Sequence, residues 1–127
     1  MRRRTPTMIL PHQVIGVQHA AAKALERAFE RSDTDATEDW LMRCHFDLAQ
    51  LWQCGEFWAV TQVITGKSGP ILHIVAAAGE FDAALVDAME LWGRGVGCVR
   101  VMFTGRPGWL RRLNGYTMSA VTALKAL

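Results

Sequence analysis

The feature that most limits how this chain can fold is a strand–helix–strand pattern that begins at residue 71. Residues 71–78 are apolar almost throughout, as strands covered on both faces are. After Gly79 the apolar side chains recur about four residues apart up to Trp92, which is the period of a helix. Residues 98–104 form a second apolar stretch of strand length. Because such crossovers are right-handed, the two strands are expected to run parallel in one sheet.

Two further strands precede this crossover. Residues 51–54 and 57–65 are rich in aromatic and β-branched side chains, and Gly55–Glu56 between them predicts a tight turn. A second turn at residues 66–70 leads into residues 71–78, so three consecutive strands are expected to be antiparallel. The predicted fold class is therefore α/β (α+β), with a mixed, mostly antiparallel sheet flanked by helices and one parallel β-α-β crossover.

Helices and strands are also expected on both sides of this region. Residues 8–10 are compatible with a short opening strand, and residues 12–31 have the apolar period of an amphipathic helix. Beyond the crossover, residues 109–114 fit one or two helical turns and residues 116–127 fit a last strand. A second helix is expected over residues 37–50, after a polar turn, with an inner stripe made by Trp40, Leu41, Cys44 and Leu48.

The length of 127 residues fits a single domain that spans the whole chain. Within it, residues 1–11 are interpreted either as a mobile basic arm or as a short first strand. The longest uncharged stretch, residues 57–66, is about half as long as a membrane-spanning helix, so no membrane partner is expected. No apolar run follows the basic start of the chain closely enough for a signal peptide, so secretion is not predicted.

Charge and cysteine content exclude several classes of site. The net charge is +2, and removing Arg2, Arg3 and Arg4 leaves −1, so contact with nucleic acid is expected only through these three arginines. The histidines and cysteines show no spacing typical of zinc sites, and no metal is expected. An odd number of widely separated cysteines indicates reduced, buried thiols: Cys44, Cys54 and Cys98.

The order of the expected elements resembles the GNAT (Gcn5-related N-acetyltransferase) fold over nearly the whole chain. At sequence level, residues 47–116 are similar to a group of small GNAT-like proteins encoded by tailed bacteriophages. The most specific part lies at residues 97–116, which contain Gly97-Cys98, a strand, Gly105-Arg106-x-Gly108-Trp109 and Leu113-x-Gly115-Tyr116. The resemblance implies the fold more strongly than it implies the chemistry.

An active member of the GNAT family would bind the pyrophosphate of acyl-CoA on main-chain N–H groups where the fourth strand meets the next helix. The family motif there is Arg/Gln-x-x-Gly-x-Gly/Ala, whereas this chain has one glycine, Gly79, followed by the acidic residues Glu80 and Asp82. Carboxylates at a helix N-terminus disfavour an anionic ligand. The family's general-acid tyrosine corresponds in position to Arg111. No catalytic residue and no cofactor are therefore assigned, and acetyl-CoA is the cofactor only if the chain is an active enzyme.

The candidate binding residues lie at Gly79 and at residues 106–112, where Arg111 and Arg112 either contact a partner or belong to a solvated helix face. Arg106, Gly108 and Trp109 follow a parallel strand, at the end where open sheets bind ligands, and the alternative is a rigid turn with Trp109 in the core and Arg106 paired with a carboxylate. Glu56 is a general base by family analogy or simply an exposed turn residue. The full candidate set for a ligand or partner is Gly79, Arg106, Gly108, Trp109, Arg111 and Arg112.

Three functions fit these observations. The first is a phage-encoded, non-catalytic GNAT-like protein that serves as a small structural or assembly component of the virion, with other virion proteins or itself as partners. The second is an active N-acyltransferase that modifies a host protein, a nucleobase or a small amine. The third is an inhibitor that binds a host defence protein. The expected location is the virion, or the host cytoplasm before assembly.

Overall fold

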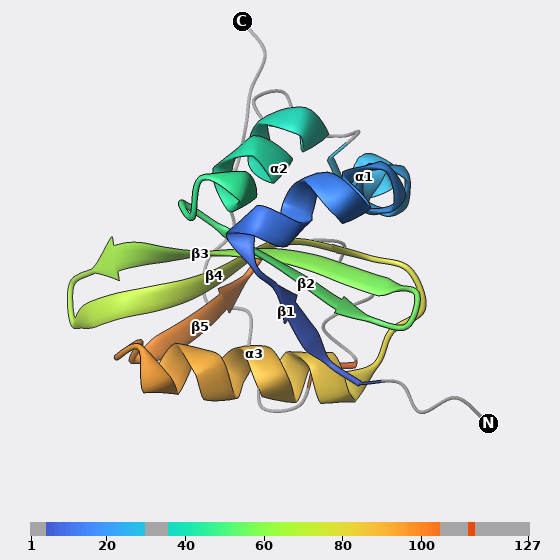
Figure 1. The fold of residues 1–127 in the computed structure, drawn as a ribbon. Helices are drawn as coiled ribbons and strands as arrows, with labels where there is room; N and C mark the ends of the chain where they lie inside the picture. The colour runs from blue at the N-terminus through green and yellow to red at the C-terminus, as the bar shows by residue number, and fades with distance from the viewer. Residues whose placement is uncertain (1–4, 30–35, 105–111, 114–127) are drawn as a thin grey trace, which may run out of the picture.

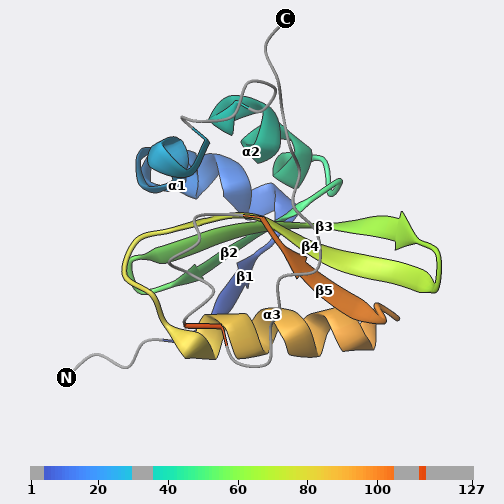
Figure 2. The same ribbon diagram turned by 180° about the vertical axis from the view of Figure 1, so that it is seen from behind.

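The structure is a computed structural model that describes residues 5–29, 36–104 and 112–113. Its centre is a five-stranded sheet with the strand order β1-β2-β3-β4-β5. Helices α1 and α2 cover one face of the sheet and α3 covers the other (Figure 1). The view from behind shows the same three layers (Figure 2). The face under α1 and α2 is called the upper face below, and the face over α3 the lower face.

The sheet is mixed, as the sequence predicts. The first four strands pair antiparallel in chain order, and β4 pairs parallel with β5 across the helix between them. The five strands are β1 (Thr7–Ile9), β2 (Gln50–Cys54), β3 (Phe57–Gly66), β4 (Gly69–Ala78) and β5 (Arg100–Phe103). The prediction of a mostly antiparallel sheet with one parallel crossover is confirmed. β1 covers three residues of the segment 1–11.

Glycines close two of the turns. Gly55 has a φ of 62° and forms with Glu56 the two-residue turn between β2 and β3. Gly69 has a φ of 133° and opens β4, so this strand begins two residues earlier than expected. In both turns the backbone adopts a conformation that L side chains rarely tolerate.

The upper helices begin after β1. The 3-10 turn η1 (Pro11–Gln13) runs into α1 (Val14–Phe29), and α2 spans Thr37–His45. None of the helices among the described residues is long and apolar enough to cross a membrane.

The expectation that the second helix extends to residue 50 is wrong. Asp47 has a φ of 61°, and the Leu48 N–H donates to the Arg43 carbonyl at 2.8 Å, a pattern that ends a helix. Gln50 then belongs to β2. Leu48 is consequently 70% exposed and does not continue the inner stripe of Trp40, Leu41 and Cys44, which are buried.

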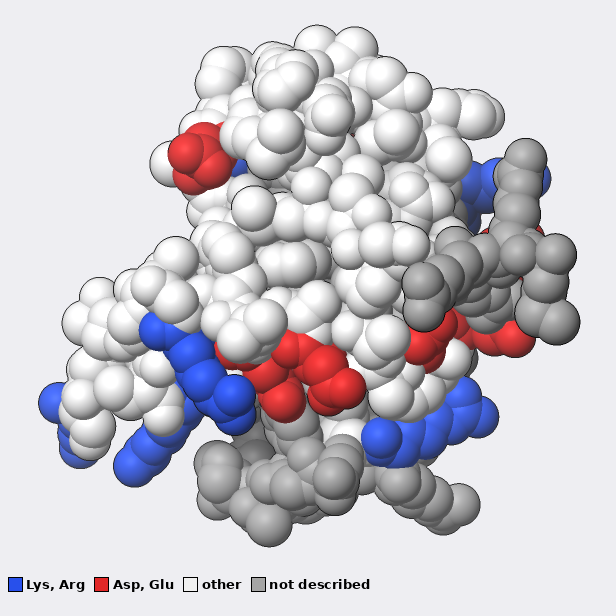
Figure 3. Space-filling view, turned by 60° about the horizontal axis from the view of Figure 1, so that its bottom comes forward, with Lys and Arg blue, Asp and Glu red and all other residues white. Residues whose placement is uncertain are grey.

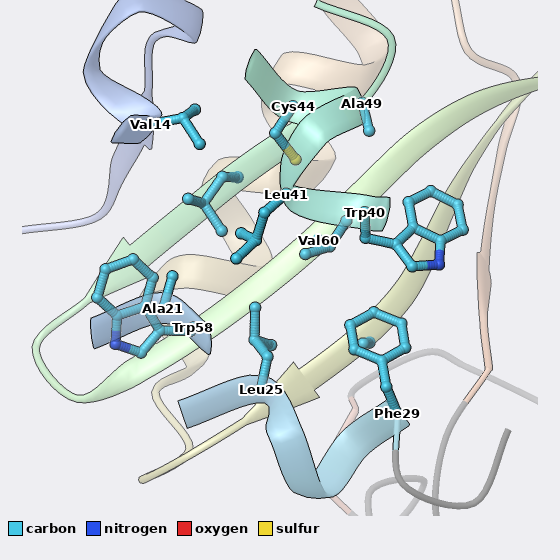
Figure 4. Close-up of a cluster of buried hydrophobic side chains, with 12 residues drawn as sticks. Val14, Ala21, Leu25, Phe29, Trp40, Leu41, Cys44, Ala49, Trp58 and Val60 are labelled. Atoms are coloured by element: carbon cyan, nitrogen blue, oxygen red, sulfur yellow. The ribbon is translucent and has the colours of Figure 1, made fainter. Parts of the chain in front are cut away.

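The upper core fills the space between the sheet and the two helices. Phe29 and Trp40, one from each helix, stack with ring centroids 6.3 Å apart. Figure 4 shows how the side chains of the helices point toward those of β3. The buried members of this cluster are Val14, Ala21, Leu25, Phe29, Trp40, Leu41, Cys44, Ala49, Leu51, Trp58, Val60 and Ala76.

The lower core lies between the sheet and α3 (Ala83–Gly95). A side chain at Gly93 would meet Leu72 at 3.1 Å, so this glycine lets the helix approach β4 closely. Leu113, which comes after β5 in the sequence, packs into the same cluster. The other buried members are Trp52, Cys54, Phe57, Ala59, Leu72, Ile74, Leu85, Val86 and Met89.

One polar side chain, Thr61, is buried in the sheet. Its hydroxyl accepts a hydrogen bond from Trp52 Nε1 at 2.9 Å and donates one to Gln50 Oε1 at 2.9 Å. Both the donor and the acceptor capacity of the hydroxyl are therefore used, which is the condition for burying it without a large cost.

Candidate functional site

The sheet opens between β4 and β5. Their pairing ends at Ile74 and Phe103, and the Thr104 N–H donates to the Ile74 carbonyl at 3.1 Å. β4 continues beyond this point to Ala78 and stays paired with β3 on its other side. In both ribbon views β5 stops near the middle of the sheet while β4 runs on (Figures 1 and 2). Within the described part of the chain, residues 75–78 have no strand neighbour on the β5 side.

A β-bulge marks the place where the sheet opens. Thr61 of β3 pairs with Ile74, and its neighbour Val60 pairs with Ala76. Val75 is therefore an extra residue in β4. A bulge increases the local twist and bends its strand. The bulge therefore lies where β4 turns away from β5.

The junction between β4 and α3 is packed against the β2–β3 turn. Gly79 has a φ of 102°, and a Cβ built there would lie 1.9 Å from the Glu56 carbonyl oxygen. No larger residue fits without moving the turn. The glycine that the sequence marks as a candidate ligand residue thus has a packing role in this structure.

A carboxylate occupies the N-terminus of α3. Asp82 is the N-cap residue, and its Oδ1 accepts a hydrogen bond from the Ala84 N–H at 3.0 Å. Its Oδ2 accepts one from the Cys54 thiol at 3.3 Å. The negative charge of Asp82 therefore lies where the helix dipole favours an anion, and one main-chain donor of the first turn is already used.

One predicted arginine reaches the same junction. The Phe81 ring packs against Phe57 with centroids 5.5 Å apart, and the Arg112 guanidinium lies 5.8 Å from the Phe81 ring centre. The neighbouring Leu113 is buried in the lower core, which holds this part of the chain next to the start of α3. Gly79 and Arg112, far apart in the sequence, thus both lie at the β4–α3 junction.

A histidine of β4 contacts polar side chains on both sides of its strand close to the bulge, Gln62 of β3 and Thr104 just after β5. His73 Nδ1 is 3.2 Å from Gln62 Nε2, and His73 Nε2 is 2.8 Å from Thr104 Oγ1. Each ring nitrogen of His73 therefore has a polar partner, and which nitrogen donates and which accepts depends on the tautomer. His73 is the titratable side chain of β4, and it lies one residue before Ile74, where the pairing with β5 ends.

The remaining predicted residues divide into two groups. Glu56 is exposed in the β2–β3 turn. Arg106, Gly108, Trp109 and Arg111 lie outside the described residues, as do Arg2 to Arg4, most of the expected helix over residues 109–114 and the expected strand over residues 116–127.

Sequence reasoning missed two contributors to this region. The Cys54 thiol that contacts Asp82 carries no motif, and the sequence assigns the histidines, His73 among them, no role beyond the absence of zinc-site spacing. The pairing of His73 with Gln62 depends on β4 beginning at Gly69, whereas the predicted turn over residues 66–70 would place Ile74 opposite Gln62.

The cysteines differ in their surroundings. Cys44 and Cys54 are buried and Cys98 is half-buried, and none of the three forms a disulfide. Burial raises the pKa of the Cys44 thiol to about 12, and burial also raises the pKa of Cys98. A thiol with a raised pKa is a poor nucleophile at neutral pH. In the described ranges, no three His, Cys, Asp or Glu side chains come together as a metal site would require.

The lower face carries both signs of charge. Figure 3 shows acidic side chains between groups of basic ones across this face. The described residues seen there form no large patch of one sign. Electrostatic attraction of a polyanion such as nucleic acid is therefore not favoured by this part of the surface.

Comparison with known proteins adds evidence at the level of the fold. No family model matches this sequence, and no curated protein matches it. Among solved structures, a ribosomal-protein-alanine N-acetyltransferase from Brucella melitensis is similar with a TM-score of 0.65 and 8% identity over 98% of both chains. A predicted acetyltransferase with acetyl-CoA from Clostridium acetobutylicum has a TM-score of 0.67 and 11% identity over 98% of this chain and 96% of that one.

A GCN5-related N-acetyltransferase from Ralstonia eutropha is similar to the same degree, with a TM-score of 0.65 and 13% identity over 98% of this chain and 99% of that one. At such identities the likeness shows the fold and leaves the activity open. The chain therefore has a GNAT-like α+β fold, in agreement with the order of elements in its sequence.

Proposed function

We propose that this chain is a GNAT-fold protein that acts by binding other proteins and does not transfer acetyl groups. The observation that carries the proposal is the Asp82 carboxylate, which caps α3 where an acyl-CoA would place its pyrophosphate. Two unit charges of like sign about 4 Å apart repel by about 1 kcal/mol in water and about 4 kcal/mol at an effective dielectric constant near 20. A pyrophosphate at this position would meet that repulsion and would also have to displace the cap.

The proposed setting is a tailed bacteriophage. Residues 47–116 resemble small GNAT-like phage proteins, and the chain without its first arginines is nearly neutral. A small structural or assembly component of the virion, made in the host cytoplasm and then incorporated, is consistent with both observations. Its partners are then other virion proteins or a second copy of this chain, with nucleic acid contacted only by Arg2, Arg3 and Arg4.

Calorimetric titration with acetyl-CoA at modest salt tests the non-catalytic part of the proposal. We expect no heat of binding up to millimolar ligand, because the anion site is filled by Asp82. Asp82→Ser is the matched variant, since serine also caps helices but carries no charge. Binding to the unchanged protein at micromolar strength, about −8 kcal/mol, would refute the proposal.

Mass spectrometry of purified particles from the source phage tests the virion role. Peptides of this chain should be present at a fixed ratio to the major capsid protein. If they are missing from particles but present in infected cells, the virion role is wrong. Affinity purification from those cells would then decide whether a host defence protein is the partner.

A second candidate is an active N-acyltransferase, and one observation favours it. The opening between β4 and β5 has His73 close to its narrow end, bonded to Thr104. In acyl transfer the amine nitrogen attacks the thioester carbonyl, the carbon–sulfur bond breaks, CoA leaves as the thiol, and a base accepts the amine proton. The His73 imidazole can accept that proton once it releases one of its partners, Gln62 or Thr104.

Release of CoA thiol distinguishes this candidate from the first. The protein would be supplied with acetyl-CoA and a mixture of amines, peptides and nucleosides, and free thiol would be measured over time. An enzyme would release thiol only when an acceptor is present and would lose this activity in His73→Gln. We expect release no faster than in the absence of protein.

A further inference from the structure

We infer that the edge of β4 at residues 75–78 binds an extended peptide segment of a partner protein as an added strand. This inference rests on the proposed function, because it names the kind of partner that a protein-binding GNAT fold would take. Edge addition of this kind uses main-chain hydrogen bonds for affinity and side-chain pockets for specificity. Strand addition requires main-chain N–H and C=O groups of β4 that point into the opening.

The direction of these groups follows from the β2–β3 turn. In a hairpin with a two-residue turn, Cys54 and Phe57 exchange main-chain hydrogen bonds, and the next residue points its groups to the other side. Trp58 therefore faces β4 and bonds to its partner Ala78. Because the direction alternates along a strand, the N–H and C=O of Ala77 point away from β3, into the opening.

The same side of β4 already accepts a strand at its other end. The Ile74 carbonyl receives the Thr104 N–H at 3.1 Å, and β5 contributes no paired residue beyond Phe103. No described residue bonds to the Ala77 main chain on this side. A peptide strand that enters beyond Thr104 would continue the ladder that β5 leaves unfinished.

The side chains along this edge leave the main chain accessible. The three residues Ala76, Ala77 and Ala78 carry only methyl groups, and these point above and below the sheet, not along its plane. Ala77 is half-buried, and a strand edge with unpaired main-chain groups invites pairing with another chain. At the far end, the Asp82 carboxylate opposes a ligand that brings phosphates, whereas a peptide offers amide groups without that charge.

Two substitutions at one position separate strand addition from other modes of binding. Ala77→Pro removes the N–H that faces the opening and places a ring there, without removing a bond to β3. Ala77→Gly keeps the N–H and is the matched control. The probe is a random library of linear 12-residue peptides displayed against the immobilised full chain, and the enriched peptides are made synthetically and titrated by fluorescence anisotropy.

We expect the enriched peptides to bind Ala77→Pro about tenfold more weakly than the unchanged protein, and Ala77→Gly within about threefold. N-methylation of single peptide amides should weaken binding at every second position, because alternate amides of an added strand face β4. This scan uses the unchanged protein, so it remains decisive if Ala77→Pro does not fold. Exchange of the Ala77 amide with deuterium should be fast in the free protein and slow in the complex.

Three results would overturn the inference. They are the absence of any enriched peptide, N-methyl effects without a period of two, and a slowly exchanging Ala77 amide in the free protein, which would mean that another part of this chain or a second copy already fills the edge. Acetyl-CoA titration separates this failure from failure of the proposed function. Binding of acetyl-CoA refutes the proposed function itself. If the protein binds neither acetyl-CoA nor any peptide, strand addition alone is refuted.

Discussion

Replacing Gly79 with alanine tests whether this glycine is required by packing against the β2–β3 turn. The backbone there has a φ of 102°, and an added Cβ would lie 1.9 Å from the Glu56 carbonyl oxygen. The neighbour is main chain, so it cannot rotate away as the end of a flexible side chain can. Either the turn moves or the junction between β4 and α3 moves.

The cost can be worked from these two features. Holding a non-glycine residue in a sparsely populated backbone conformation costs about 1 to 3 kcal/mol. Overpacking that shifts the backbone costs a further 1 to 3 kcal/mol, roughly. Gly79→Ala is therefore expected to lower the free energy of unfolding by about 3 kcal/mol, a large part of the 5 to 15 kcal/mol typical of a domain.

Urea denaturation followed by tryptophan fluorescence measures this change. With a slope of about 1.5 to 2 kcal/mol per molar urea, the midpoint should fall by about 1.5 to 2 M. Gly16→Ala is the control, because Gly16 lies in α1 and an added Cβ would meet nothing within 4 Å. That variant should be more stable by about 0.5 to 1 kcal/mol. If Gly79→Ala moves the midpoint by less than about 0.5 M, Gly79 does not lie as close to the Glu56 carbonyl as the structure places it.

Three further substitutions test other parts of the structure. Thr61→Val should lower the free energy of unfolding by about 1 to 3 kcal/mol in urea denaturation, because the Trp52 indole N–H is left buried without its acceptor. Asp82→Ala should cost about 1 kcal/mol through loss of the α3 cap, and Asp82→Ser should recover most of it. Burial raises the pKa of Cys44 from 9.0 to about 12, so between these pH values the unfolded chain has lost the thiol proton while the folded protein keeps it. The free energy of unfolding therefore falls as the pH rises through this range, and Cys44→Ala should remove this part of the fall. The expected difference in slope is about 1.4 kcal/mol per pH unit.

Each of these has a result that would contradict it. For Thr61, the control is Thr61→Ser, which keeps the hydroxyl, and equal loss in both variants would show that the hydrogen bonds are unimportant. For Asp82, equal stability of the alanine and serine variants would show that the N-cap does not stabilise α3. For Cys44, parallel curves of stability against pH in the two proteins would show that the thiol is not held protonated.

The central part of the fold could be predicted from the sequence because its signals are local. Gly55–Glu56 lies between two strand-like segments, and the helical period after Gly79 separates two apolar stretches. The end of α2 could not be predicted in the same way. The apolar period continues to Leu48, but Asp47 adopts a left-handed conformation and Gln50 is needed in β2, so pairing in the sheet outweighs the helical pattern.

The candidate site could be predicted only in outline. The sequence marks the β4–α3 junction as unusual, and Asp82 just before a helical stretch is a readable N-cap. What it does not reveal is contact between distant segments. The Glu56 carbonyl that requires Gly79 to lack a side chain, the Cys54 thiol on Asp82 and the Arg112 guanidinium over Phe81 all come from other parts of the chain.

The extra residue at Val75 also determines how β4 serves both cores. Before it, Leu72 and Ile74 point into the lower core, and after it Ala76 points into the upper one, so the strand changes phase halfway along its length. After the bulge both faces of the strand are covered, because Ala76 and Ala78 pack into the upper core and Ala77 packs against the lower one. Deleting this one residue would place Ala76 directly after Ile74, so the following side chains would keep their layers and their partners on β3, and the strand would lose the bulge and its local bend.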